Sequence, residues 1–156
     1  MKLVIVESPT KCKTIGKYLG KDYKVMASVG HIRDLGTSGP GGLGVDVNNG
    51  FKPTYVICKD KGPIIKELKS ACKKADEVLL ATDPDREGEA IAWHLAQVLS
   101  LDVDSTKRLE FHEITKHALT KAIDNPRTID MNLVASQETR RIMDRIIGFK
   151  LSYLLQ

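Results

Sequence analysis

The fold is decided by residues 79–89, which read LLATDPDREGE. An apolar run ends there in carboxylates at alternate positions, Asp83, Asp85 and Glu87, and a helical pattern follows at once. Two unit charges about 4 Å apart repel by roughly 4 kcal/mol at an effective dielectric near 20. A fold keeps such carboxylates together only with a proton, an arginine or a divalent cation among them. Because the donors would all be oxygen atoms, the predicted ion is Mg²⁺.

The composition is that of one soluble globular domain. The chain has 156 residues, of which 42% are hydrophobic and 28% charged, which is enough for one full core. No apolar run approaches the roughly 20 residues of a membrane helix, and no signal-peptide pattern opens the chain, so no membrane partner is expected. The three cysteines lack a C-x-x-C spacing. They predict neither a disulfide framework nor a zinc site, and they favour the reducing cytoplasm.

Charge is unevenly distributed, although the net charge is only +4. Acidic residues gather at 83–89, whereas basic residues gather at 11–24 and 140–150. An anionic pocket flanked by cationic surfaces suits a metal-dependent enzyme that acts on phosphates. Composition alone would equally favour an ordinary solvated surface.

Hydrophobic patterning predicts strands that alternate with helices. The predicted strands are 2–6, 25–29, 55–58, 78–81 and 108–111, and the predicted helices are 8–19, one opening at 62–63, 86–99, one capped by Thr115 and one from about 130 onward. This alternation implies an α/β fold: a mostly parallel, open, Rossmann-like sheet of about four strands with helices on both faces. In such sheets ligands gather at the carboxyl ends of the strands.

Residues 36–53 hold half of the twelve glycines and are predicted to form a loop or hairpin inserted in the domain. Within them, residues 39–44 formally match G-x-G-x-x-G. They follow no strand, open no helix and contain a proline, so a dinucleotide site is rejected. The predicted organisation is one domain over 1–129, which includes this insertion, and a terminal helix over 130–156.

Glu7 ends the first predicted strand. If that strand neighbours the one before Asp83, then Glu7, Asp83 and Asp85 meet at one edge of the sheet. Such a site could bind Mg²⁺, and the charges of its neighbours could set Glu7 apart as a proton carrier. The alternative is that acidic residues are common near helix N-termini because of the helix dipole. The dipole explains Glu87 and Glu89 readily, but it hardly explains Glu7.

Four strings together resemble the Toprim module of bacterial type IA DNA topoisomerases. They are residues 4–11 (VIVESPTK), 30–35 (GHIRDL), 83–94 (DPDREGEAIAWH) and 140–145 (RRIMDR). Primases and some nucleases share the module, but the order and extent of this match favour topoisomerases. The resemblance implies relaxation of negatively supercoiled DNA through transient cleavage of one strand. The substrate would be a single-stranded segment of underwound DNA, and a tyrosine from another domain would form a 5′-phosphotyrosine link.

The resemblance also implies roles for individual residues. Asp83 and Asp85 would bind Mg²⁺ with support from Glu87. Glu7 would act on the 3′-oxygen as general acid in cleavage and general base in resealing, and it is counted among the metal ligands. Lys11 would stabilise charge on the scissile phosphate from a helix N-terminus that already favours anions. Arg86 would help to hold the acidic cluster or contact phosphate.

The predicted DNA contacts are His31, Arg140, Arg141 and Arg145. Arg141 and Arg145 are four residues apart and therefore share a helix face, from which guanidinium groups can bind phosphates. The alternative is a surface helix with a salt bridge between residues four apart, such as Arg140 and Asp144. The other histidines show no metal-ligand spacing and are predicted to be structural.

No tyrosine of this chain has the arginine two residues later that accompanies the nucleophile of the family. The remaining domains of a topoisomerase would supply that tyrosine, so we expect the chain alone to bind Mg²⁺ and DNA weakly and to relax nothing. A Toprim nuclease or primase stays open as an alternative, although those families lack the 30–35 string and the arginine helix. A non-catalytic DNA-binding module also stays open. A D-x-D phosphatase is disfavoured, because Glu7 stands where its aspartyl nucleophile would be.

Overall fold

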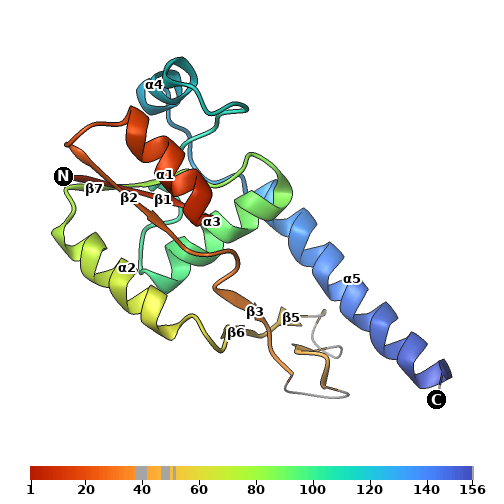
Figure 1. Ribbon diagram of the computed structural model, residues 1–156. Coiled ribbons are helices and arrows are strands. Elements are labelled where there is room, and N and C mark those ends of the chain that lie inside the picture. The colour runs from red at the N-terminus through yellow and green to blue at the C-terminus, as the bar shows by residue number, and fades with distance from the viewer. Residues whose placement is uncertain (38–41, 47–49, 51, 156) are drawn as a thin grey trace.

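A four-stranded parallel sheet lies at the centre of the protein, with the strand order β2–β1–β7–β8 (Figure 1). The computed structural model describes residues 1–37, 42–46, 50 and 52–155. The strands of this sheet are β1 (Lys2–Val6), β2 (Tyr23–Ala27), β7 (Glu77–Leu80) and β8 (Lys107–Arg108). The prediction of an α/β fold with a parallel sheet of about four strands is confirmed.

Helices cover both faces of this sheet. They are α1 (Pro9–Tyr18) and α4 (Lys116–Asp124) on one face, and α2 (Gly62–Lys74) and α3 (Arg86–Val98) on the other (Figure 1). Alternate residues of β1 belong to the two cores: Val4 and Val6 pack on the α1 side, whereas Leu3 and Ile5 pack on the α3 side. A strand that is buried on both faces needs a continuous apolar run, and β1 has one.

Side-chain caps fix where three of the helices begin. Oxygen atoms of Ser8, Asp85 and Thr115 accept hydrogen bonds from the backbone N–H groups of Lys11, Gly88 and Ala118, respectively. These residues have extended backbones and short polar side chains, which is the usual chemistry of an N-cap. The caps explain why the predicted helix starts agree closely with the structure.

Two small antiparallel sheets lie beside the main sheet. One pairs β3 (Arg33–Leu35) with β6 (Tyr55–Ile57), and the other pairs β4 (Val45–Asp46) with β5 (Lys52–Pro53). The strand predicted at 55–58 therefore belongs to a separate sheet, and β3 was not predicted at all. The glycine-rich insertion contains β4 and β5, but its residues 38–41, 47–49 and 51 lie outside the described part of the chain.

Two strand predictions need correction. The strand predicted at 25–29 ends at Ala27, because Val29 and Gly30 have left-handed φ angles of 56° and 79° and turn the chain away. The strand predicted at 108–111 is only the two-residue β8, which begins one residue earlier. Both strands still occupy an edge of the main sheet.

The last helix, α5 (Met131–Leu155), is the longest of the described helices. It packs against α3 near its beginning, where Val134 joins the core, and then extends away from the main sheet past β3 and β6 (Figure 1). Within the described residues, no helix combines the length and apolar character required to cross a lipid bilayer.

Candidate active site

The carboxyl ends of β1 and β7 meet at one rim of the sheet. The two strands are parallel neighbours in a register that pairs Ile5 with Leu80. The chain continues beyond them so that the backbone N–H of Asp83 donates to Glu7 Oε2 at 3.2 Å. The prediction that Glu7 and Asp83 share one edge of the sheet is therefore confirmed.

Lys11 joins these two carboxylates. Its Nζ, which α1 supplies from its first turn, donates to Glu7 Oε1 at 2.9 Å and to Asp83 Oδ1 at 2.8 Å. Its side chain is only 7% exposed, and the ammonium lies 5.0 Å from the ring centroid of Phe111. The hydrogen bond from Lys11, opposed by partial burial, lowers the pKa of Asp83. The ammonium thus neutralises part of the negative charge at the rim.

Among the described residues, Asp85, Arg86 and Glu87 form no hydrogen bond or ion pair with Glu7, Lys11 or Asp83. Asp85 Oδ1 accepts from Gly88 N at 2.7 Å as the N-cap of α3. Glu87 is half exposed and lies 3.8 Å from His31 Nε2. Arg86 is half-buried, and none of the ion pairs between described residues includes it.

The fit of Mg²⁺ can be tested against this arrangement. The chemistry fits, since the rim offers carboxylate oxygens, which are the ligands of hard cations. Among the described residues, however, no three His, Cys, Asp or Glu side chains lie close enough together to enclose an ion. The lysine and the helix cap engage the carboxylates instead, so a cation would have to draw Asp83 and Asp85 away from these partners.

Gly88 makes the close turn from β7 into α3 possible. A Cβ atom at this position would lie 2.0 Å from the carbonyl oxygen of Asp83. Backbone atoms cannot move aside as a flexible side chain could, so only glycine fits. Glycine at position 88 is therefore a packing requirement at the rim.

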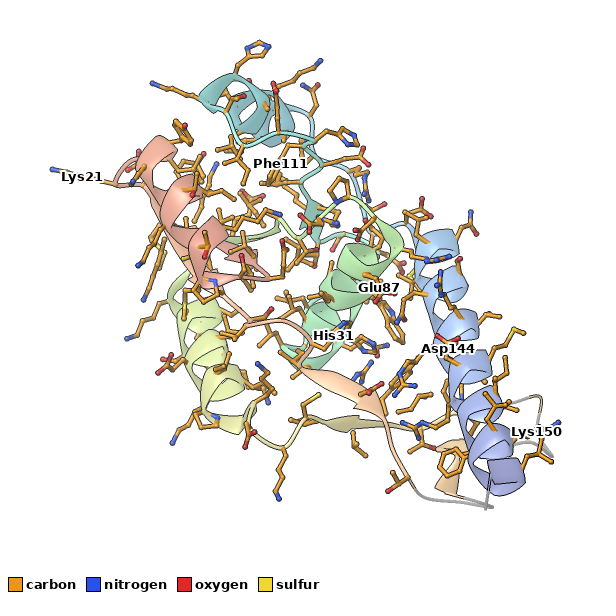
Figure 2. All side chains as sticks on the ribbon, turned by 45° about the vertical axis from the view of Figure 1, so that its right-hand side comes forward. Lys21, His31, Glu87, Phe111, Asp144 and Lys150 are labelled. Atoms are coloured by element: carbon orange, nitrogen blue, oxygen red, sulfur yellow. The ribbon has the colours of Figure 1, made fainter. Side chains whose placement is uncertain are left out.

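A second region lies between α3, α5 and the β3–β6 sheet. It encloses a cavity of about 250 Å³, lined by residues that include His31, Arg33, Asp34, Glu87, His94, Arg140, Arg141 and Asp144. Figure 2 shows Glu87 at the start of α3 with His31 below it, and Asp144 on α5 to their right. The structure thus brings His31, Arg140 and Arg141, three of the four predicted DNA contacts, to one cavity.

Two of the three arginines of α5, Arg141 and Arg145, have internal partners in this region. Arg141 donates from Nε and Nη2 to the two carboxylate oxygens of Asp34, at 3.0 and 2.9 Å. Arg145 donates to the backbone carbonyls of Leu35, Gly36 and Leu43. Arg140 is exposed, and within the described residues it forms no ion pair with Asp144, so the alternative of a salt bridge four residues apart is wrong for this pair.

Comparison with known proteins agrees with the geometry of the rim. The family model for the Toprim domain matches residues 2–114 of this chain. The chain belongs to the Toprim family. It is also similar to full-length topoisomerase I from Thermotoga maritima, with 46% sequence identity and a TM-score of 0.90. That match covers 98% of this chain but 26% of the Thermotoga chain, so the Toprim chain described here spans about a quarter of its length. The predicted resemblance to a topoisomerase Toprim domain is confirmed.

His94, which is predicted to be structural, has its side chain packed inside the protein. It is buried in α3, where its Nδ1 accepts from Arg33 Nε at 2.8 Å and its ring meets that of Tyr55 edge to face. Burial, with a smaller contribution from the charge of Arg33, lowers the pKa of His94 to about 3. This histidine therefore remains neutral near pH 7.

Sequence reasoning missed a buried ion network beneath the acidic loop. Glu89 and Arg108 are both 0% exposed and pair at 3.0 Å, and Arg127 binds both oxygens of Glu89 at 2.7 and 3.0 Å. The helix dipole, which the sequence offered as the reason for Glu89, does not account for a carboxylate bound by two arginines. Position 108 lies among mostly polar and charged residues (105–110, STKRLE), so no local signal in the sequence could have found this network.

Proposed function

We propose that this Toprim domain is the metal-binding part of a type IA DNA topoisomerase. Such an enzyme relaxes negatively supercoiled DNA by transient cleavage of a single strand through a 5′-phosphotyrosine. The observation that carries the proposal is the junction of Glu7, Lys11 and Asp83 at one sheet edge. The similarity to the Thermotoga topoisomerase supports it.

Mg²⁺ is the proposed cofactor, with Glu7, Asp83, Asp85 and Glu87 as the residues that would hold it. When bound, the ion would supply positive charge near the phosphate that reacts. The oxygen-only donor set and the adjacency of Glu7 and Asp83 support this assignment.

Glu7 is the proposed proton carrier. In cleavage, the tyrosine hydroxyl loses its proton to water and its oxygen bonds to phosphorus, while the bond to the 3′-oxygen breaks and a protonated Glu7 gives its proton to that oxygen. In resealing, Glu7 takes the proton back as the 3′-oxygen attacks phosphorus, and the bond to the tyrosine oxygen breaks, so that this oxygen regains a proton from water. Lys11 would turn its ammonium from the carboxylates to the scissile phosphate, and Arg86, which is free of ion pairs among the described residues, would contact phosphate.

The proposed DNA contacts are His31, Arg140, Arg141 and Arg145, which would bind a single-stranded segment of underwound DNA. His31 and Arg140 are exposed beside the cavity, whereas Arg141 and Arg145 must first leave their internal partners. We further propose that 1–129, with the insertion 36–53, is the Toprim unit. The helix over 130–156 would lead toward the domain that grips DNA.

The proposed location is the cytoplasm. Cys12, Cys58 and Cys72 are free thiols in this structure. A reducing compartment keeps such thiols reduced, which supports the assignment.

A supercoil relaxation assay tests the proposal. We expect no relaxation by the chain alone, and Mg²⁺-dependent relaxation once the domains that carry the tyrosine are added. Glu7→Gln should abolish the reconstituted activity, whereas His117→Gln, on the exposed side of α4, should leave it unchanged.

Other outcomes of the same assay would favour the alternatives. Nicking of the plasmid by the chain alone would favour a Toprim nuclease. DNA binding by the reconstituted mixture without relaxation would favour a non-catalytic DNA-binding module.

A further inference from the structure

An arginine that is wholly removed from solvent lies directly beneath the acidic loop. Arg108 is the last residue of β8 and is 0% exposed. Burial lowers the pKa of Arg108, and the nearby carboxylate of Glu89 offsets part of this shift. An arginine in a protein nevertheless stays charged. Because a buried charge is costly unless all its hydrogen bonds are made, the partners of this guanidinium are informative.

The guanidinium of Arg108 binds the backbone that leads into the loop. Its Nη1 donates to the carbonyl oxygen of Thr82 at 2.7 Å, and its Nη2 donates to that of Asp83 at 2.6 Å. Further hydrogen bonds reach the carbonyls of Leu80 and Leu109. Thr82 and Asp83 lie beyond the end of β7, where pairing between strands no longer fixes the chain. Arg108 therefore extends the ordered backbone into the acidic loop.

Glu89 in turn fixes the position of the Arg108 side chain. Its Nε donates to Glu89 Oε1 at 3.0 Å, and Glu89 also accepts from Arg127 and from the backbone N–H of Asp130. Glu89 belongs to the first turns of α3, so the network joins the start of that helix to the end of β7. The planar guanidinium can reach both sides at once, which a lysine ammonium cannot do.

Two side chains hold the backbone of Asp83: Arg108 binds its carbonyl oxygen, and Glu7 binds its N–H. Its carbonyl oxygen accepts from Arg108, and the same oxygen touches the space that a side chain at Gly88 would need. Its N–H donates to Glu7, and its carboxylate accepts from Lys11. A shift of the carbonyl would consequently move the carboxylate relative to Glu7.

We propose that Arg108 is the positioning residue of this site: by binding the carbonyls of Thr82 and Asp83, it keeps the Asp83 carboxylate beside Glu7, where a divalent cation can be bound. The part of the proposal that concerns the cation rests on the proposed function. The part that concerns the loop rests on the hydrogen bonds alone.

A matched pair of substitutions tests the role. Arg108→Lys and Arg127→Lys make the same chemical change beside the same carboxylate, but only Arg108 binds the loop carbonyls. The Mg²⁺ dissociation constant of the whole chain would be measured by calorimetry, well below the melting temperature of each variant. Arg108→Lys should raise that constant about tenfold, as loss of an outer-shell partner does at other metal sites, and Arg127→Lys should not.

Hydrogen exchange of the Asp83 amide supplies a second readout that needs no metal. The amide should exchange faster in Arg108→Lys and at the native rate in Arg127→Lys, even if both variants melt at lower temperature. Equal changes in the two variants, or none in Arg108→Lys, would overturn the proposal. A native chain that binds no Mg²⁺ would overturn the proposed metal site, while the exchange comparison would still decide the role of Arg108.

If Arg108→Lys does not fold, the native chain can be used. Binding of Mg²⁺ to a loop that Arg108 supports should slow exchange of the Arg108 Nε proton, because coupling between two sites is reciprocal. An exchange rate that is unchanged at saturating Mg²⁺ would contradict the proposal.

Discussion

The acidic rim and the arginine side of α5 both contain ion pairs, but they differ in burial. At the rim, the supporting pair Glu89–Arg108 is 0% exposed on both sides. On the α5 side, Arg141 and Asp34 are 31% and 47% exposed, although their geometry is bidentate. Water can replace the partners of the second pair but not those of the first. The support beneath the rim is therefore fixed, whereas the Arg141–Asp34 pair can open to water.

The largest expected effect is that of removing Glu89. Glu89→Ala leaves two arginines without their carboxylate, one of them buried, and should lower the free energy of unfolding by about 3–5 kcal/mol. Urea denaturation measures this value. Glu110→Ala is the control, since Glu110 is 45% exposed and lies 3.5 Å from the same Arg127. If Glu89→Ala lowers the free energy of unfolding no more than Glu110→Ala does, the difference in burial between the two regions has no consequence for stability.

The next effect concerns the rigidity of the rim. Gly88→Ala forces the Asp83 carbonyl to move, and overpacking of this kind costs about 1–3 kcal/mol of unfolding free energy. Gly16→Ala in α1 is the matched control, because nothing lies within 4 Å of its Cβ position. That change should stabilise the protein by about 0.5–1 kcal/mol. Thermal denaturation should show a lower melting temperature for Gly88→Ala and a higher one for Gly16→Ala. A higher melting temperature for Gly88→Ala would contradict the close approach of the Asp83 carbonyl to position 88.

The cavity side should show a pH dependence that comes from His94. Its pKa is about 3 in the fold against an ordinary value of 6.5, so the unfolded chain takes up the proton first. Stability should therefore fall as the pH drops below about 6.5, by up to about 1.4 kcal/mol per pH unit. His94→Gln should flatten this slope in urea denaturation series, and the exposed His117→Gln should not. An unchanged slope in His94→Gln would contradict the neutral, buried state.

The smallest effect on stability is expected at Asp34. Asp34→Asn should cost less than about 1 kcal/mol, because the pair with Arg141 is partly exposed. It should also release Arg141 to DNA and increase the salt slope of single-strand binding by about 0.7. Asp144→Asn removes the same charge from the same cavity and is the control. An equal increase in both variants would indicate a general charge effect rather than release of one arginine.

Local signals explain what the sequence predicted well. Apolar runs and N-caps such as Ser8 and Thr115 are read over a few residues, and they placed most helices and the buried strands within a few positions. The meeting of Glu7 with Asp83 followed from parallel topology, because neighbouring parallel strands end at the same edge. The catalytic and metal-binding roles of these residues remain predictions.

What the sequence could not predict depends on distant partners. Arg141 meets Asp34 across 107 positions, and β3 exists only because β6 pairs with it. Glu89 and Arg108 look like ordinary surface charges until the fold places them face to face. Asp85 is predicted to bind a metal, but the backbone N–H of Gly88 in α3 donates a hydrogen bond to one of its carboxylate oxygens.

The order of the strands has a consequence for synthesis of the chain. β1 leaves the ribosome before the other strands of the main sheet and can pair with β2 soon afterwards, but its other edge waits for β7, some 75 positions later. Until then a strand of almost wholly aliphatic residues presents an open edge, which is a known template for aggregation. Nascent chains from which β7 has not yet emerged should therefore depend on chaperones more than chains from which it has emerged.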